Sequence, residues 1–438
     1  MVRGQPPRRR PRPLRPPDRG LSRRRFRRNN MSAPSSNPPA PPLKTRWGTV
    51  VVALVAGIIA AGHVGKLPPA LPMLRAELSL DLVAASWVAS VFSITGMVVA
   101  VLLGATADRI GHWRLSILGL ALLIAGGVGG SLAVGALPLL VSRFVEGIGF
   151  LAVVVAAPSL IAHATYGRGR QMALGFWAGY LPLGVTIMIL VAPAMIEWAG
   201  WQGLWLLVAG LAGIWFVVMA AAARRAPPHR ASTDSAEPVW RNIRLGISRL
   251  GPWMVAACFV LYASQLYAII TWLPTFMIEE RGMAQGTAAA LTALVVAANG
   301  CFSFLAGWFL HRNTPPWFLL VVSGVVMTFG ALGAFSAGVP DIARYIFCLL
   351  LAGVGGSVAS AAFAVAPSLA PSPTQIGTVN GILVQASSFG QFLGPPVMAA
   401  VVSAFGAWES ALWMMVGANV LLATLALLVR HLARTAEA

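Results

Sequence analysis

Long apolar blocks constrain the fold of this chain more than any other feature. The 438 residues are 57% hydrophobic and only 10% charged, too little polar surface for a soluble protein of this size. About twelve blocks have a length of about 20 residues, which crosses a bilayer as a helix. Their length and their lack of strict alternation exclude a barrel. We therefore predict an all-α membrane protein with twelve transmembrane helices, approximately at 48–67, 85–106, 115–134, 137–162, 171–194, 203–223, 253–277, 287–310, 317–338, 343–366, 376–403 and 409–430.

Basic residues indicate which ends of these helices face the cytoplasm, because cytoplasmic loops are enriched in Lys and Arg. The loops after even-numbered blocks hold most of the arginines, whereas the opposite loops are poorer in bases and carry acids such as Glu197, Glu279 and Glu409. The loop at 367–374 has no charge and is the exception. Both termini are therefore predicted to be cytoplasmic.

The chain is predicted to consist of two halves. A polar stretch rich in Pro and Arg, at 226–251, is typical of a cytoplasmic linker between bundles at 47–225 and 252–432. The halves also repeat one another, since Gly147 recurs as Gly353 and Trp201 recurs as Trp408, at offsets of 206 and 207. Two parallel repeats with a site at their interface are the plan of many secondary transporters.

Residues 1–46 are predicted to be a disordered Arg/Pro-rich cytoplasmic tail. Residues 1–30 hold twelve Arg and one Asp, so +11 of the net charge of +19 lies there. Met31 is an alternative start of the chain, which would remove this segment. A nucleic-acid-binding arm is the weaker alternative, and no secretory signal follows the Arg run. We expect the bilayer, and no nucleic acid, as a partner.

A charged turn follows the second block, in the run from Gly104 to Arg114. It resembles the loop between helices 2 and 3 of major facilitator superfamily transporters, although Thr106 and His112 depart from the usual pattern. The resemblance covers about residues 47–432 and implies the major facilitator fold, with two six-helix bundles. It also implies a gate, made of Gly104, Asp108, Arg109, Gly111 and Arg114.

In this gate, Asp108 is expected near the start of the eleventh helix, around 372–375. The free amide groups and the positive end of that helix would attract its carboxylate and latch the two halves. A simple marker of topology is the alternative interpretation of the same charges.

Charged residues within the predicted helices are the strongest candidates for a site, since each is costly in a membrane. Arg143 and Glu146 lie three residues apart on the fourth helix, where they can pair. The resemblance implies substrate contact or proton coupling for this pair, and a structural ion pair is the alternative. His63 and Lys66 share a face of the first helix. They are predicted to line the cavity if that helix continues to Leu74, whereas Lys66 would reach the interface if it ends near Gly65.

The second half offers neutral polar groups in place of charges. Tyr262, Gln265 and Trp272 share one face of the seventh helix, and Gln385 lies on the eleventh. These residues are interpreted either as lining a cavity or as forming hydrogen bonds between helices. Basic groups of the first half facing neutral donors of the second would suit a small anion.

The resemblance implies a secondary active transporter that works by alternating access, in the bacterial inner membrane. We expect a small organic or inorganic anion as substrate and protons as the coupling ion. The segments 265–274 and 380–396 are similar to the cyanate-transporter and related anion-importer branch. The alternative is efflux of amphipathic compounds by a drug/proton antiporter, although Tyr180 occupies a proline site of the antiporter run GxxxGP.

A membrane sensor or scaffold without transport is the third alternative. The chain has no phosphate-binding GxxxxGK[ST] loop, no metal-ligand cluster and no nucleophile–base pair. We therefore expect neither an enzyme nor a bound cofactor.

Overall fold

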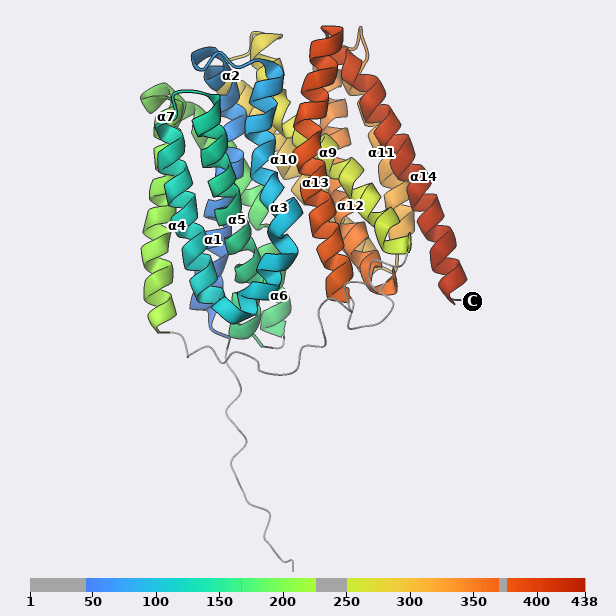
Figure 1. Ribbon diagram of the computed structural model, residues 1–438. Coiled ribbons are helices and arrows are strands. Elements are labelled where there is room, and N and C mark those ends of the chain that lie inside the picture. Colours follow the sequence, from blue (N-terminus) through green and yellow to red (C-terminus); the bar gives the residue numbers. More distant parts are fainter. Residues whose placement is uncertain (1–44, 167, 226–249, 370–375, 438) are drawn as a thin grey trace, which may run out of the picture. The chain divides into compact units, whose positions relative to one another are not determined.

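The computed structural model describes residues 45–166, 168–225, 250–369 and 376–437, and all regular structure in these ranges is helical (Figure 1). They belong to a single compact unit. The predicted tail at 1–46 and the predicted linker at 226–251 lie almost entirely outside the described residues, so both stay predictions. The described segments before and after the gap at 226–249 are called the first and second half below.

The helices follow one another with short connections, as the apolar blocks predict. The first half holds α1 Trp47–Gly65, α2 Leu67–Glu77, α3 Leu82–Ile110, α4 His112–Ser131, α5 Ala136–Ala164, α6 Arg168–Ala178 and α7 Tyr180–Arg224. The second half holds α9 Leu250–Glu279, α10 Gln285–His311, α11 Pro316–Phe335, α12 Asp341–Leu369, α13 Ile376–Phe405, the short 3₁₀-helix η2 Trp408–Ser410 and α14 Ala411–Glu437.

Ten helical segments of the described residues are long and apolar enough to cross a membrane, and α3 contributes a shorter apolar stretch at Leu82–Val98. One of the ten is 53 residues long, Met172–Arg224. It bends where Ala199 and Gly200 leave helical geometry, and Gly200 has a φ of +68°, which glycine adopts without strain. The count of twelve crossings stays a prediction.

A glycine also precedes the equivalent tryptophan of the second half. Gly406 has a φ of +70°, two residues before Trp408, as Gly200 lies one residue before Trp201. Both tryptophans are buried. The two halves therefore enter their last long helix through similar turns, as expected for the predicted repeat.

The first membrane helix continues past its break at Lys66. The backbone of Lys66 is helical, with φ −69° and ψ −28°, and its N–H donates to the carbonyl of Gly62 at 3.0 Å. Helices α1 and α2 together form a continuous apolar span, Trp47–Glu77. Of the two alternatives for this helix, the structure shows the one in which it continues to Leu74.

The most extensive contacts between the halves are made by three pairs of helices. Helix α3 packs against α13, α7 against α10, and α2 against α9, and α3 and α13 are seen side by side in Figure 1. A large apolar core of buried side chains includes residues of both halves, among them Leu71, Trp205, Trp272 and Leu383. Burial of polar and charged groups in this setting is therefore costly unless they are paired.

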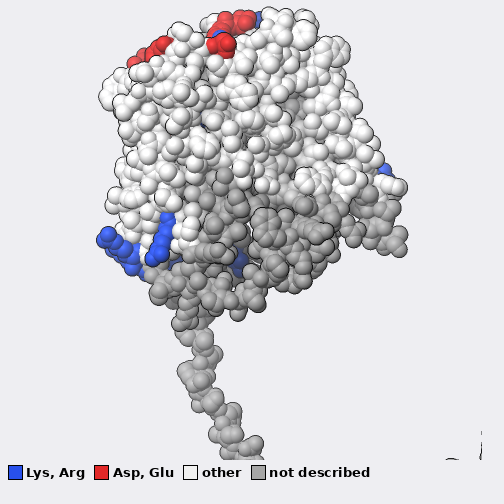
Figure 2. Space-filling model, in the orientation of Figure 1, with Lys and Arg blue, Asp and Glu red and all other residues white. Residues whose placement is uncertain are grey.

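Charged side chains separate between the two ends of the molecule. Figure 2 shows acidic side chains gathered at the end where α2 terminates, with a few basic atoms among them, while most basic side chains in view lie toward the opposite end. This separation is what the positive-inside rule predicts for a protein with the α2 end outside. We call that end the predicted outer end, since the orientation itself stays a prediction.

Candidate functional site

Four charged or titratable side chains meet in the interior of the first half: His63 on α1, Lys66 between α1 and α2, and Arg143 and Glu146 on α5. We call them the tetrad. Each of the four residues is at most 1% exposed. Lys66 Nζ donates to Glu146 Oε1 at 2.5 Å, and Arg143 Nη1 donates to Glu146 Oε2 at 2.5 Å. Both oxygens of the single carboxylate are therefore engaged.

The remaining contacts fix the tetrad to the backbone of α1. Arg143 Nη1 also donates to the carbonyl oxygen of His63 at 2.8 Å. His63 Nδ1 lies 3.1 Å from Glu146 Oε1 and 3.5 Å from Lys66 Nζ. The tetrad thus ties α1 to α5 through one acidic group, and any change in the charge of Glu146 acts on three partners at once.

Aromatic rings and small residues surround the tetrad. The guanidinium carbon of Arg143 lies 4.5 Å from the centroid of the Phe92 ring, and Lys66 Nζ lies 4.4 Å from that of Trp205. Both are cation–π distances. A glycine at position 126 on α4 gives Glu146 its room, because a Cβ there would lie 2.6 Å from Glu146 Cγ.

The tetrad has more positive than negative charge. With His63 neutral, the formal charges of Lys66 (+1), Arg143 (+1) and Glu146 (−1) sum to +1. Three buried nitrogens, His63 Nε2, Arg143 Nε and Trp205 Nε1, have no hydrogen-bond partner among the described residues. A buried surplus of cationic groups and donors is expensive, which makes the tetrad the leading candidate for a functional site.

A cavity of about 330 Å³ lies between the two halves. Its wall combines aromatic and neutral polar side chains, and no charged side chain of the described residues lines it. The lining includes Tyr180, Tyr267, Phe259, Phe304, Asn299, Ser360 and Gln391. We call it the central cavity.

Helix α1 borders both the central cavity and the tetrad. Val64 lines the cavity, whereas its neighbours His63 and Lys66 belong to the tetrad and are absent from the lining. Gly65 packs tightly on α7, where a Cβ would lie 2.7 Å from the carbonyl oxygen of Val185, another lining residue. The tetrad is therefore one helix away from the space where a substrate would fit, and closed to it in this conformation.

The neutral residues that were predicted as candidates in the second half lie in different surroundings. Tyr262 lines the central cavity and donates from its hydroxyl to Asn299 Oδ1 at 3.1 Å. Gln265 Nε2 donates to Asn419 Oδ1 at 2.9 Å, and Trp272 Nε1 donates to the carbonyl of Pro395 at 3.0 Å. Neither Gln265 nor Trp272 lines the central cavity.

Gln385 connects the halves. Its Nε2 donates to the carbonyl of Met97 on α3 at 3.3 Å. Close to it, Gln391 of α13 lines the central cavity and accepts a hydrogen bond of 3.4 Å from Ser93. The roles of the predicted residues stay predictions, and for Gln265, Trp272 and Gln385 the structure provides hydrogen-bond partners on other helices.

The predicted gating motif is only partly within the described side chains. Helix α3 continues to Ile110 and α4 begins at His112, so the expected loop is a turn at Gly111 alone, with a φ of +90°. This φ explains the glycine at that position. Arg114 is exposed on the first turn of α4. The surroundings of Gly104, the side chains of Asp108 and Arg109, and residues 370–375 opposite them in the prediction lie outside what the structure describes.

An ion pair between the halves was not predicted from the sequence. Arg75 Nη1 on α2 lies 2.5 and 2.7 Å from the two carboxylate oxygens of Glu279, at the end of α9. Gln285 Nε2 also donates to the carbonyl of Pro69, at 3.1 Å. These contacts join the halves at the predicted outer end. Arg75 and Glu279 lie at helix ends. The sequence pattern predicts that charges there belong to loops, but it does not predict which residue each charge pairs with.

The described residues include no group of three or more His, Cys, Asp or Glu side chains that could hold a metal ion. The ionisable groups of the tetrad can themselves exchange protons and attract an anion.

Comparison with known proteins places this architecture in a family. The chain is similar to NiaP of Bacillus subtilis (strain 168), named as a niacin/nicotinamide transporter, with 26% identity over 65% of this chain and 72% of NiaP. It is also similar to the hexuronate transporter of that organism, with 22% identity over 88% of this chain and 94% of the relative. A solved bacterial homologue of the human lysosomal transporter Spinster shares the fold, with a TM-score of 0.76 at 16% identity, over 90% of this chain and 98% of that one.

The model of the Major Facilitator Superfamily matches residues 47–387, most of the chain. The chain therefore belongs to the major facilitator superfamily, and it is a multi-pass membrane transporter rather than an enzyme.

Proposed function

We propose that the chain carries a small organic anion across the bacterial inner membrane and that protons drive it through the tetrad. One observation carries the proposal: Glu146 is the shared counter-ion of Lys66 and Arg143 within a buried cluster of net charge +1, which α1 separates from the central cavity. A cluster of this sign favours an anion in its neighbourhood, and the low dielectric of the interior strengthens the effect.

Proton binding and anion binding support one another at this site. A proton on Glu146 would raise the formal charge of the tetrad from +1 to +2 and release Lys66 and Arg143 from their carboxylate. The anion would then bind more tightly, and by linkage the bound anion would favour the protonated form. This coupling predicts that both move in the same direction, so an inward proton gradient drives uptake.

The lining of the central cavity favours an anion with an aromatic or otherwise apolar body. Phenyl and phenol rings surround the space, while Tyr262, Asn299 and Gln391 supply neutral polar groups. Relatives whose names specify substrates include transporters of niacin/nicotinamide, sulfoacetate and hexuronate, of which the last two substrates are anions at neutral pH. These names support a small organic anion as the class of substrate, but they do not identify the compound that this chain transports.

Transport by the purified chain in liposomes tests the proposal. Nicotinate and nicotinamide have the same ring and differ in the charge of one group, so the pair isolates the effect of the anion. We expect radiolabelled nicotinate, sulfoacetate or glucuronate to accumulate against its gradient when the exterior is acidic. A protonophore should abolish accumulation, nicotinamide should not accumulate, and protein-free liposomes correct for passive entry. Failure of all three anions under a verified proton gradient would exclude this substrate proposal.

Efflux of amphipathic compounds is the second candidate. The uncharged, aromatic lining of the central cavity favours it, because such a wall accepts apolar ligands without charge pairing. A multidrug resistance protein, MdtL of Shigella flexneri, is also similar, with 25% identity over 80% of this chain. If the same liposomes extrude ethidium and take up no anion, the result would favour efflux over anion uptake.

A further inference from the structure

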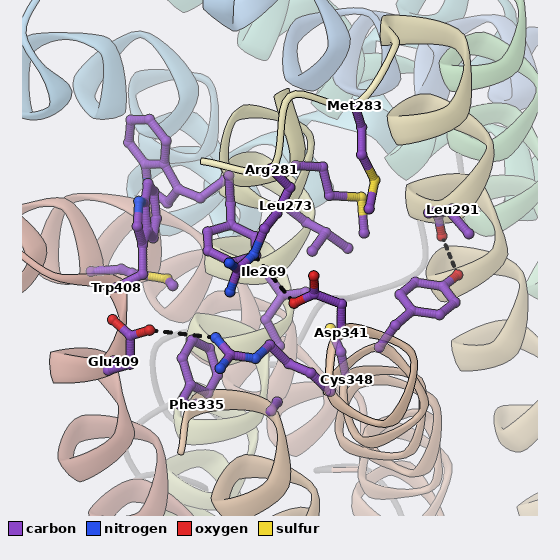
Figure 3. Close-up of a pocket in the computed structure, with 17 residues that line it drawn as sticks. Ile269, Leu273, Arg281, Met283, Leu291, Phe335, Asp341, Cys348, Trp408 and Glu409 are labelled. Carbon is purple, nitrogen blue, oxygen red and sulfur yellow. Dashed lines mark hydrogen bonds and ion pairs between the residues drawn. The ribbon is translucent and has the colours of Figure 1, made fainter. Parts of the chain in front are cut away.

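A second cavity, of about 90 Å³, lies within the second half at the predicted outer end (Figure 3). It shares no lining residue with the central cavity. Aromatic, aliphatic and thioether side chains form most of its wall, among them Trp272, Phe276, Met277, Met398 and Trp408. Such a wall is suited to a small apolar group. We call this space the outer cavity.

Two arginines line the outer cavity and are loosely paired with acids. Arg281 Nε lies 3.3 Å from Asp341 Oδ1, and Arg344 Nη1 lies 3.5 Å from Glu409 Oε1. Figure 3 shows both pairs as dashed lines, with Asp341 and Glu409 on separate ribbons. The pairs are long compared with charge-assisted hydrogen bonds, which measure about 2.7–2.9 Å. The guanidinium groups therefore keep capacity for a further acceptor.

Burial shows that Arg344 is the group that most needs a partner, since the side chain of Arg281 is 32% exposed. The side chain of Arg344 is only 12% exposed, whereas those of Asp341 and Glu409 are 55% and 42% exposed. Water can hydrate the two acids. Arg344 Nη2 donates to the carbonyl of Ser336 at 3.1 Å, but its buried Nε has no acceptor among the described residues. A buried donor without an acceptor is costly, so Arg344 has room for a further acceptor at the wall of the outer cavity.

We propose that the outer cavity binds a small organic monocarboxylate. Its carboxylate would be held by Arg344 and Arg281, and its apolar chain would lie among the aromatic side chains. An engineered cavity of about 150 Å³ admits benzene, so a space of about 90 Å³ suits a chain of a few carbons. This site is independent of the substrate that the central cavity carries, because the two share no residue.

Binding of three matched probes tests the charge that this site selects. Trifluorobutyrate, trifluorobutanamide and trifluorobutylamine have the same chain with an anionic, neutral or cationic head. Fluorine NMR of each, titrated with the full chain in lipid nanodiscs, measures its dissociation constant. We expect the anion to bind about tenfold more tightly than the amide, since a charge-assisted contact contributes about 1.4 kcal/mol or more. Equal binding of anion and amide, or preference for the amine, would overturn the proposal.

Variants then assign the binding to this cavity. Arg344→Gln should weaken binding of trifluorobutyrate about tenfold, to the level of the amide. Arg312→Gln is the matched control, because it also removes one arginine of the second half, at the end of α10, and Arg312 does not line the outer cavity. If Arg344→Gln does not fold, Arg281→Gln replaces it, since Arg281 lies in the short loop between α9 and α10. Unchanged anion binding in a folded Arg344 or Arg281 variant would place the ligand elsewhere and refute the assignment.

Discussion

Lys66 Nζ lies 2.5 Å from Glu146 Oε1, which joins the first membrane helix to α5 across 80 residues of sequence. The contact is fully buried, and Arg143 holds the other oxygen of the same carboxylate. Two cations therefore depend on one acid for their neutralisation. Protonation of that acid is the simplest event that could release α1–α2 from α5, and the predictions for the tetrad follow from this arrangement.

Substitution Glu146→Gln should abolish accumulation driven by a proton gradient. The amide keeps the shape of the side chain but cannot exchange a proton, so the tetrad is held in its more positive form. Exchange of labelled for unlabelled anion should persist, because the site still binds and reorients. Uptake and exchange in liposomes measure the two activities. The control is Glu197→Gln, which removes an exposed acid outside the tetrad and should leave both activities unchanged.

The double substitution Arg143→Leu with Glu146→Leu should give a folded protein that does not transport. Buried ion pairs are often replaced by apolar residues without loss of stability. Lys66 also loses its counter-ion in this variant, but a buried lysine can release its proton and become neutral, so expression and monodispersity should be retained. Transport should fail if Arg143 contacts the anion or controls coupling. Near-normal flux through the double variant would instead show that the pair only orients α5.

Much of this fold could be predicted from the sequence, because membrane helices follow from apolar length alone. The Arg143–Glu146 contact was also predictable, since both residues lie on one helix at a spacing of three. His63 and Lys66 were predicted as candidate site residues that line the cavity, but their contact with Glu146 was missed, because it depends on how α1 packs against α5. Periodicity places these residues on a face of α1 and gives no information on which helix that face meets.

For the second half too, helical periodicity predicts which residues share a face but not which helix that face contacts. Gln265 and Trp272 share a helical face with Tyr262, yet only Tyr262 lines the central cavity. Their polar atoms are taken by Asn419 and by the carbonyl of Pro395, which belong to other helices. The outer cavity could not be predicted at all, since its lining residues come from α9 to η2 and meet only in the folded bundle.

Gly126→Ala should destabilise the first half. The added Cβ would lie 2.6 Å from Glu146 Cγ and 2.8 Å from the carbonyl oxygen of Ser142, so either α4 or the tetrad must shift. Overpacking of this kind costs about 1–3 kcal/mol, and thermal unfolding in detergent should show a lower midpoint. Gly129→Ala on the same helix is the control, because a Cβ there meets nothing within 4 Å. Equal midpoints for the two variants would contradict the tight fit around Glu146.

Asp108→Asn should slow turnover and leave substrate affinity largely intact. The prediction comes from the resemblance of the run from Gly104 to Arg114 to a gate at the predicted cytoplasmic end, away from the central cavity. Initial rates over a range of substrate concentrations separate the maximal rate from the half-saturating concentration. A large rise in the latter at an unchanged maximal rate would be the wrong outcome for a gate.

The Arg75–Glu279 pair should stabilise the closed form of the predicted outer end, because it joins α2 to α9 there. Partly exposed ion pairs contribute about 1 kcal/mol or less, which is about fivefold in an equilibrium constant. Glu279→Arg removes the pair and adds repulsion from Arg75, so it should lower the ratio of closed to open molecules by about fivefold. Distances between spin labels at cysteines replacing Ala76 and Glu280, in a background without the native cysteines, measure this ratio. The exchanged pair, Arg75→Glu with Glu279→Arg, should restore it, and Glu197→Arg should have no effect. A distance distribution that is the same in the parent and in Glu279→Arg would mean that the other contacts of α2, such as the hydrogen bond from Gln285 to Pro69, hold this end closed without the ion pair.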